Sequence, residues 1–219
     1  EKGYTPDTIL FDLKTQFTGY CRPDDLETHD NCYSPGNYDN KFRGPMTLRD
    51  ALSQSINIVA VKTLYLVGLD SALDMAKRMG LTTLGDKSRY GLTLVLGGGE
   101  VSPLDMTSAY GVFATEGVRH PAQPILRIED TSGAILESFA DRRQRVLTEN
   151  VARTISSILS DDEARSPTFG RQSLLYFPGY DVAVKTGTTN NYRDAWVVGY
   201  TPNLVAGAWV GNNDNSPME

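Results

Sequence analysis

Three short segments near the C-terminus constrain the fold of this chain most. Residues 180–186, 195–200 and 204–210 each have the length and the content of β-branched and aromatic residues that are typical of strands. Their connections, residues 187–194 and 201–203, are polar and too short to contain a crossover helix. Strands joined in this way must run antiparallel. We therefore expect an antiparallel sheet at the C-terminal end of the chain.

Helical signals occupy the middle of the chain. Thr47 and Asp50 have the spacing of a capping box, which predicts a helix from Leu48 to about Gln54. Caps and helical spacing predict further helices at residues 58–66, 71–79, 102–115 and 149–159. A short strand is expected near residues 8–12 in an otherwise turn-rich start, and a hairpin at residues 125–139. Helices in the middle and strands at the end indicate an α+β fold.

Size and charge limit the classes of function. The 219 residues suffice for one domain with a sizeable core, which we expect to be residues 1–219. A net charge of -6 argues against a nucleic-acid partner, because phosphate binding requires clustered Lys and Arg. No stretch reaches the roughly 20 apolar residues of a membrane span. The chain opens at Glu1 without Met, so we expect it to be part of a longer polypeptide that carries any targeting or anchoring segment.

The cysteines and histidines give little information alone. Cys21 and Cys32 lie in a loop-like stretch, where one short disulfide and two free thiols fit almost equally well. His29 and His120 are far apart and no Cys-x-x-Cys spacing exists, so we expect no metal site.

Two short motifs could carry chemistry. The stretch at 185–189 is predicted to end a strand, where a lysine supplies positive charge, a glycine admits a ligand and hydroxyls can bind a carboxylate. Taken alone, it is more simply a strand running into a polar hairpin loop. The second motif, Ser55-Ile56-Asn57, falls between two predicted helices, where a hydroxyl and an amide can face one cleft. Taken alone, Ser55 is more simply a cap of the next helix. The residues of the first motif are Lys185, Thr186, Gly187, Thr188 and Thr189.

The two motifs together resemble a known family. Class A β-lactamases and penicillin-binding proteins share Ser-x-x-Lys, Ser-Asp-Asn and Lys-Thr-Gly. This chain has the second as Ser55-x-Asn57 and the third at 185–187, in the same order. Residues 37–39, 44–52 and 55–62 closely resemble the segment around Ser-x-Asn in class A (bifunctional) penicillin-binding proteins. Residues 96–101, 108–110, 193–202 and 209–214 are also similar to that family. The glycine triplet at 97–99 is expected to be a structural turn, because no phosphate-loop pattern surrounds it.

The resemblance implies a β-lactamase/transpeptidase-like fold, with an antiparallel sheet flanked by helices, and a serine D,D-transpeptidase. Its substrates would be D-Ala-D-Ala stem peptides of peptidoglycan, and β-lactams would be taken as look-alikes. Ser55 and Lys185 would form a proton network, and Asn57 would hold the acyl amide. Thr186 and Thr188 would bind the substrate carboxylate. Gly187 and Thr189 would belong to the same substrate-binding segment. The resemblance implies no cofactor and no metal. It also implies a location at the extracytoplasmic face of a membrane, anchored through segments outside this chain.

The chain departs from the family pattern at the nucleophile. Ser34 is the only serine before Ser53, and the residue three positions on is Asn37 rather than lysine. We therefore expect a chain cut just after the Ser-x-x-Lys element and short of the closing helix, incomplete at both ends and unable to acylate alone. Two alternatives remain open. One is a serine β-lactamase or D,D-carboxypeptidase, and the other is a non-catalytic module that binds β-lactams or peptides.

Overall fold

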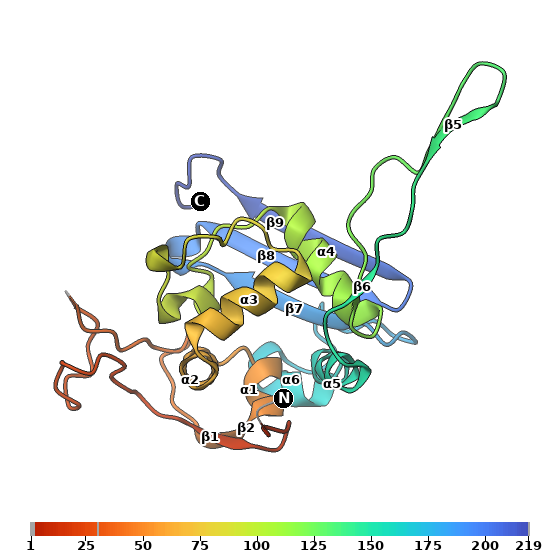
Figure 1. Cartoon of the computed structure of the whole chain (residues 1–219). Coiled ribbons are helices and arrows are strands. Elements are labelled where there is room, and N and C mark those ends of the chain that lie inside the picture. Colours follow the sequence, from red (N-terminus) through yellow and green to blue (C-terminus); the bar gives the residue numbers. More distant parts are fainter. Residues whose placement is uncertain (1–2, 30, 219) are drawn as a thin grey trace.

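The three predicted C-terminal strands form one antiparallel sheet. The computed structural model describes residues 3–29 and 31–218, residue 190 through its backbone alone. The sheet has the order β7-β8-β9, with β7 at Ala183–Thr188, β8 at Asp194–Thr201 and β9 at Leu204–Gly211. In the described part of the chain β7 pairs with β8 alone, which leaves its other edge free. The long helix α4, Pro103–Ala114, crosses one face of this sheet (Figure 1).

The predicted helices are confirmed, with small shifts at their ends. They are α1 (Leu48–Ser53), α2 (Asn57–Val67), α3 (Leu69–Met79), α4 and α5 (Glu149–Leu159). α3 begins two residues earlier than expected, because Gly68 at φ 88° ends α2 and starts α3 without an intervening loop. Short 3₁₀ turns occupy Lys87–Arg89, Leu92–Leu96 and Asn190–Tyr192.

One helix was not predicted. α6 covers Asp162–Phe169 and contains Pro167, which the sequence patterns treat as a helix breaker. The structure shows how the proline is accommodated. The carbonyl of Glu163 loses its usual amide donor at position 167, and the Ser166 hydroxyl donates to it at 2.8 Å instead. Asp161 caps the helix by accepting from the amide of Ala164 at 2.9 Å.

The N-terminal region forms a small lobe beside the helices. β1 (Ile9–Asp12) is the expected strand, and it pairs antiparallel with β2 (Gly44–Thr47), which was not predicted. The intervening loop is closed by a Cys21–Cys32 disulfide, the first of the two states that the sequence left open.

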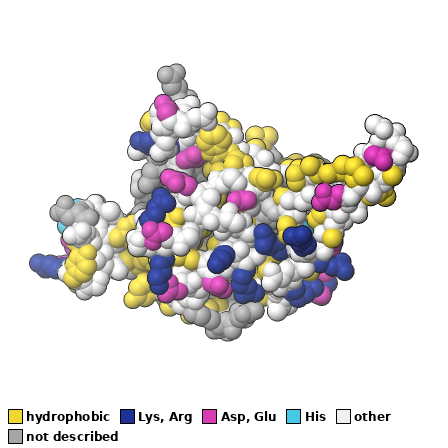
Figure 2. All heavy atoms as spheres, turned by 45° about the horizontal axis from the view of Figure 1, so that its top comes forward, with side chains coloured by type: hydrophobic (Ala, Val, Ile, Leu, Met, Phe, Trp, Pro, Cys, Tyr) yellow, Lys and Arg dark blue, Asp and Glu magenta, His cyan; other side chains and the backbone are white. Residues whose placement is uncertain are grey.

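Two further strand pairs lie between α4 and α5. β3 (Val118–Arg119) pairs with β6 (Gln144–Arg145). The predicted hairpin is confirmed as β4 (Arg127–Glu129) and β5 (Ile135–Ser138), and it projects as an arm lined with apolar side chains (Figure 2).

The core lies between the sheet and its helices, which confirms the α+β class. Tyr200 of β8, Ala183 of β7 and Leu159 of α5 form one buried cluster. A second cluster, centred on Met46 and Val59, fixes α1 and α2 against the N-terminal lobe. No helix among the described residues combines the length and the apolar character needed to cross a membrane.

Candidate active site

Ser55 lies in the break between α1 and α2, as predicted. Its backbone has a conformation that residues other than glycine usually avoid. Its φ is +59°, in the left-handed region. The amide of Ser55 donates to the carbonyl of Leu52 at 3.2 Å, and the amide of Ile56 donates to that of Ala51 at 2.9 Å. This pair of bonds is the Schellman C-cap, in which glycine usually occupies the left-handed position. A serine there carries strain of about 1–3 kcal/mol, a cost that suggests a use for its hydroxyl.

The structure argues against the simpler reading of Ser55 as a helix cap. The N-cap residue of α2 is Ile56, and its side chain makes no capping hydrogen bond. The Ser55 hydroxyl instead accepts a hydrogen bond from Lys185 Nζ at 2.7 Å, across 130 residues of sequence. The two predicted motifs therefore meet at one point, between the α1–α2 break and strand β7.

Lys185 occupies a site that favours loss of its proton. Its Nζ also donates to the carbonyl of Thr186 at 2.7 Å. Burial lowers the pKa of the Lys185 ammonium from its ordinary value near 10.5 to about 8. At pH 7 about a tenth of such a lysine is neutral, against fewer than one in a thousand for an exposed one. Lys185 and Ser55 can thus pass a proton between them near neutral pH.

Asn57 is the first residue of α2, and its side chain is oriented by a loop of the N-terminal lobe. Its Nδ2 donates to the carbonyl of Gly36 at 3.1 Å. The loop thus holds the side-chain nitrogen of Asn57. Asn57 lies two residues after Ser55, at the N-terminal end of α2. The structure therefore joins Ser55 and Lys185 directly, whereas the Asn57 side chain binds the Gly36 carbonyl.

The remaining predicted residues lie along the end of β7, which confirms that this motif ends a strand. Alternation along the strand puts Thr186 and Thr188 on the face opposite to Lys185 and Gly187. Thr189 differs from its neighbours, because its hydroxyl donates to Asp194 Oδ2 at 2.8 Å and accepts from the Asp194 amide at 2.9 Å. Thr189 therefore closes the turn between β7 and β8.

Two further features border the site. The Gly97–Gly99 stretch forms the structural turn that we predicted, with Gly97 at φ 94° as the C-cap of the 3₁₀ helix before it. Tyr38 and Tyr192, to which the sequence assigned no role, join the N-terminal lobe to the turn between β7 and β8. The Tyr38 hydroxyl donates to that of Tyr192 at 3.3 Å, and this bond raises the pKa of Tyr38. The only signal for Tyr38 was its position within the family-like segment 37–39.

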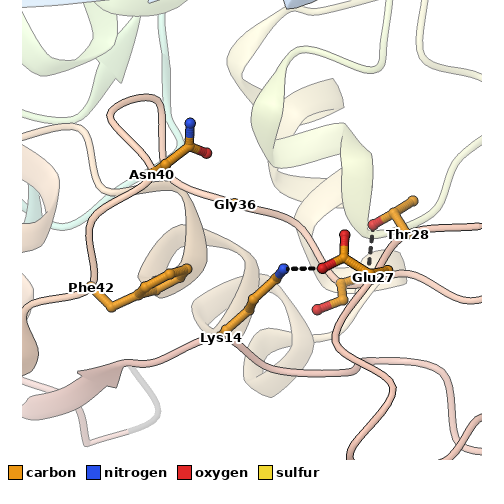
Figure 3. Close-up of a pocket in the computed structure, with 7 residues that line it drawn as sticks. Lys14, Glu27, Thr28, Gly36, Asn40 and Phe42 are labelled. Atoms are coloured by element: carbon orange, nitrogen blue, oxygen red, sulfur yellow. Dashed lines mark hydrogen bonds and ion pairs between the residues drawn. The ribbon is translucent and has the colours of Figure 1, made fainter.

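A pocket of about 430 Å³ lies in the N-terminal lobe (Figure 3). Lys14 and Glu27 form an ion pair of 2.9 Å across it. Gly36, whose carbonyl binds Asn57, belongs to its lining. Gly36 thus both accepts from the Asn57 side chain and borders this pocket.

One group of potential metal ligands was not foreseen. Asp25, His29 and Cys32 bring their ligand atoms within 4.8 Å of one another. The sulfur of Cys32, however, is bonded to Cys21 and cannot serve as a thiolate. His29 Nε2 lies 2.8 Å from Asp25 Oδ2, and this hydrogen bond lowers the pKa of the Asp25 carboxyl.

Comparison with family models gives one match. Residues 19–215 match the model described as "Penicillin binding protein transpeptidase domain". The match includes all seven predicted site residues, from Ser55 to Thr189.

Curated relatives and a solved structure agree with this match. Penicillin-binding protein 1A of Aquifex aeolicus is 40% identical over 181 residues, covering 81% of this chain and 23% of the relative. Penicillin-binding protein 2D of Bacillus subtilis is 30% identical over 225 residues, covering 100% of this chain and 31% of the relative. The crystal structure of penicillin-binding protein 1A from Haemophilus influenzae superposes with a TM-score of 0.79 at 26% identity, covering 98% of this chain and 36% of that one. The chain thus spans less than a third of the length of these curated relatives.

Proposed function

The chain belongs to the penicillin-binding protein transpeptidase family, and from this premise we propose that it forms part of a peptidoglycan D,D-transpeptidase and β-lactam target. The observation that carries the proposal is the 2.7 Å hydrogen bond from Lys185 Nζ to Ser55 Oγ. It joins the two motifs in a geometry suited to proton transfer. Neither motif alone would distinguish an active site from a loop.

The proposed reaction is acyl transfer through a serine ester. A serine hydroxyl attacks the carbonyl between the two D-Ala residues, the peptide bond breaks, and the terminal D-Ala leaves with a proton on its nitrogen. The amine of a second stem peptide then attacks the ester and releases the serine. We assign to Ser55 and Lys185 the delivery of the proton that the leaving nitrogen needs.

We propose that the substrate binds along the free edge of β7. An extended peptide can add to such an edge through main-chain hydrogen bonds. Thr186 and Thr188 lie on one face of that strand and Lys185 on the other, so groups from both faces reach an edge-bound chain. We assign the substrate carboxylate to the two threonine hydroxyls. The Thr188 amide supplies one donor to the oxyanion, and the Asn57 side chain holds the acyl amide.

We propose that the attacking serine is supplied from outside these 219 residues. None of the serines in the chain is followed three residues later by lysine. In the family pattern that lysine activates the nucleophile. Residues 1–219 would then supply the proton network and the strand edge, and another part of the polypeptide would supply the nucleophile and its base.

We also propose a location at the extracytoplasmic face of a bacterial membrane, with anchoring through other parts of the polypeptide. The Cys21–Cys32 disulfide supports this, because such bonds persist in oxidising compartments.

Covalent labelling by a fluorescent penicillin tests the function. We expect the full-length protein to be labelled and a Ser55→Ala variant of it to be labelled far more slowly. Isolated residues 1–219 should remain unlabelled. An unlabelled full-length protein, or a label on any serine within these residues, would refute the proposal. Release of D-Ala without transfer to an amine would indicate a carboxypeptidase instead.

A further inference from the structure

The start of α2 is held by a residue remote in sequence. The first amides of a helix lack partners within it, and a side chain at the N-cap usually supplies one. Ile56 cannot do so. The Asn37 Oδ1 accepts instead from the amide of Ile58, in the first turn of α2, at 3.2 Å. The neighbouring Gly36 carbonyl accepts from the side chain of Asn57. Two adjacent residues therefore hold both the backbone and the functional side chain at this helix terminus.

The amide of Asn37 is itself fixed in one orientation. Its Nδ2 donates to Asp12 Oδ1 at 2.7 Å and to the Lys41 carbonyl at 2.7 Å. A flipped amide would set its oxygen against the Asp12 carboxylate and its nitrogen against the Ile58 amide. Asn37 is only 5% exposed and Asp12 is fully buried, so water cannot replace these bonds.

Asp12 is anchored in turn. Its Oδ2 accepts from the Arg43 amide at 2.9 Å, and the Arg43 guanidinium lies 3.7 Å away. Lys62 of α2 approaches the same carboxylate, and its Nζ donates to the carbonyl of Phe11 at 2.6 Å. The buried charge is thus balanced by two cations, one from the N-terminal lobe and one from α2.

We propose that Asn37 and Asp12, here called the Asn37–Asp12 clamp, are positioning residues for the Ser55-x-Asn57 element. This inference rests on the proposed function. Because the N-cap residue of α2 makes no capping bond, the hydrogen bonds of the clamp restrain its first turn. Releasing the clamp lets the start of α2 move, and with it Asn57 and the strained Ser55 turn. Displacements of about 1 Å at such groups cost around a hundredfold in rate.

An exchange of the two side chains tests the clamp in the full-length protein. Asn37→Asp sets two buried carboxylates against each other and removes the donor to Asp12. The double variant Asp12→Asn with Asn37→Asp restores the bond between positions 12 and 37 with donor and acceptor exchanged, and a carboxylate oxygen still accepts from the Ile58 amide. The bond to the Lys41 carbonyl is not restored, because position 37 no longer carries a donor. Lys41→Ala is the matched control, because it removes an exposed side chain of the same loop and keeps the carbonyl that Asn37 binds.

The readouts are the rate constant of acylation at saturating fluorescent penicillin, the thermal midpoint and hydrogen exchange at the Ile58 amide. We expect Asn37→Asp to lower the rate constant about ten- to a hundredfold and to speed exchange at Ile58. The double variant should recover part of both, since it regains the bond to position 12 but not the bond to the Lys41 carbonyl. Lys41→Ala should match the wild type.

Two results would overturn the clamp. One is an Asn37→Asp rate within about twofold of wild type. The other is a double variant that regains thermal stability without regaining the acylation rate, which would mean a purely structural pair. If the wild type itself does not react with penicillin, the proposed function fails. Exchange at Ile58 then still decides whether the clamp holds the helix.

Discussion

The left-handed backbone at Ser55 leads to a prediction about stability. Glycine adopts this conformation without cost, whereas any side chain with a Cβ is strained in it. Ser55→Gly and Ser55→Ala both remove the hydroxyl that accepts from Lys185, so both lose the same hydrogen bond. They differ in the Cβ alone. We therefore expect the glycine variant to be the more stable of the two, although both should react with penicillin far more slowly than the wild type.

The size of the difference follows from two opposing contributions. The left-handed conformation costs a residue with a Cβ about 1–2 kcal/mol relative to glycine. The greater freedom of glycine in the unfolded chain offsets about 0.4–1 kcal/mol of this. The net free energy of unfolding should therefore favour glycine by about 1 kcal/mol. For a domain of this size that corresponds to a thermal midpoint about 2–4 °C higher.

Scanning calorimetry of the full-length protein and its two variants measures the difference, in the transition assigned to this domain. Penicillin labelling of the same samples measures activity, which we expect to fall equally in both variants. An alanine variant as stable as the glycine variant would show that the turn is not strained. An active glycine variant would show that the hydroxyl is not needed.

Four further predictions follow from the structure. The acylation rate of wild type should fall about tenfold between pH 7 and pH 9, because the charged fraction of Lys185 drops from about 0.9 to 0.1 around a pKa of about 8. In Lys185→Arg, which stays charged, a rate-versus-pH series should show no such fall, and a fall that persists there would assign it to another group. Replacing Cys21 and Cys32 by serine should destabilise the N-terminal lobe by up to about 3 kcal/mol, seen as faster proteolysis there, and unchanged proteolysis would contradict this. Val112→Ala, at a fully buried position, should lower the free energy of unfolding in urea by about 2 kcal/mol, whereas a change near zero would mean that the core relaxes around it. Tyr38→Phe removes a hydrogen bond between the hydroxyls of two exposed tyrosines, so the free energy of unfolding should change little. We expect the half-saturating penicillin concentration to shift, and an unaltered concentration would exclude a role of Tyr38 in ligand access.

Local signals in the sequence predicted the helices and strands well. α5 has the predicted bounds, Glu149–Leu159, because the Thr148 side chain caps it by accepting from the amide of Val151. α6 was not predicted, and its internal Pro167 opposes the helical signal of the acidic first turn that follows Asp161. An Asp cap with acidic residues after it could have revealed that helix.

The site was less accessible to local reasoning. Ser55 alone is more simply a helix cap, a reading that the structure contradicts, because its hydroxyl binds Lys185. Resemblance to a family brought the two motifs together, whereas neither spacing nor periodicity could. The Asn37–Asp12 pair spans 25 residues and depends on the fold of the N-terminal lobe. No pattern within one helix or strand encodes such a pair.

The contact between Ser55 and Lys185 also has a consequence for how the protein folds. Closing a loop of 130 residues is slow compared with forming a helix or a hairpin, because the loop entropy is lost before the contact forms. The α1–α2 turn and the C-terminal hairpins can each form locally, but the proton network requires that both have formed and met. Reaction with penicillin would therefore serve as a clock for the last stage of refolding, since partly folded chains would remain unlabelled.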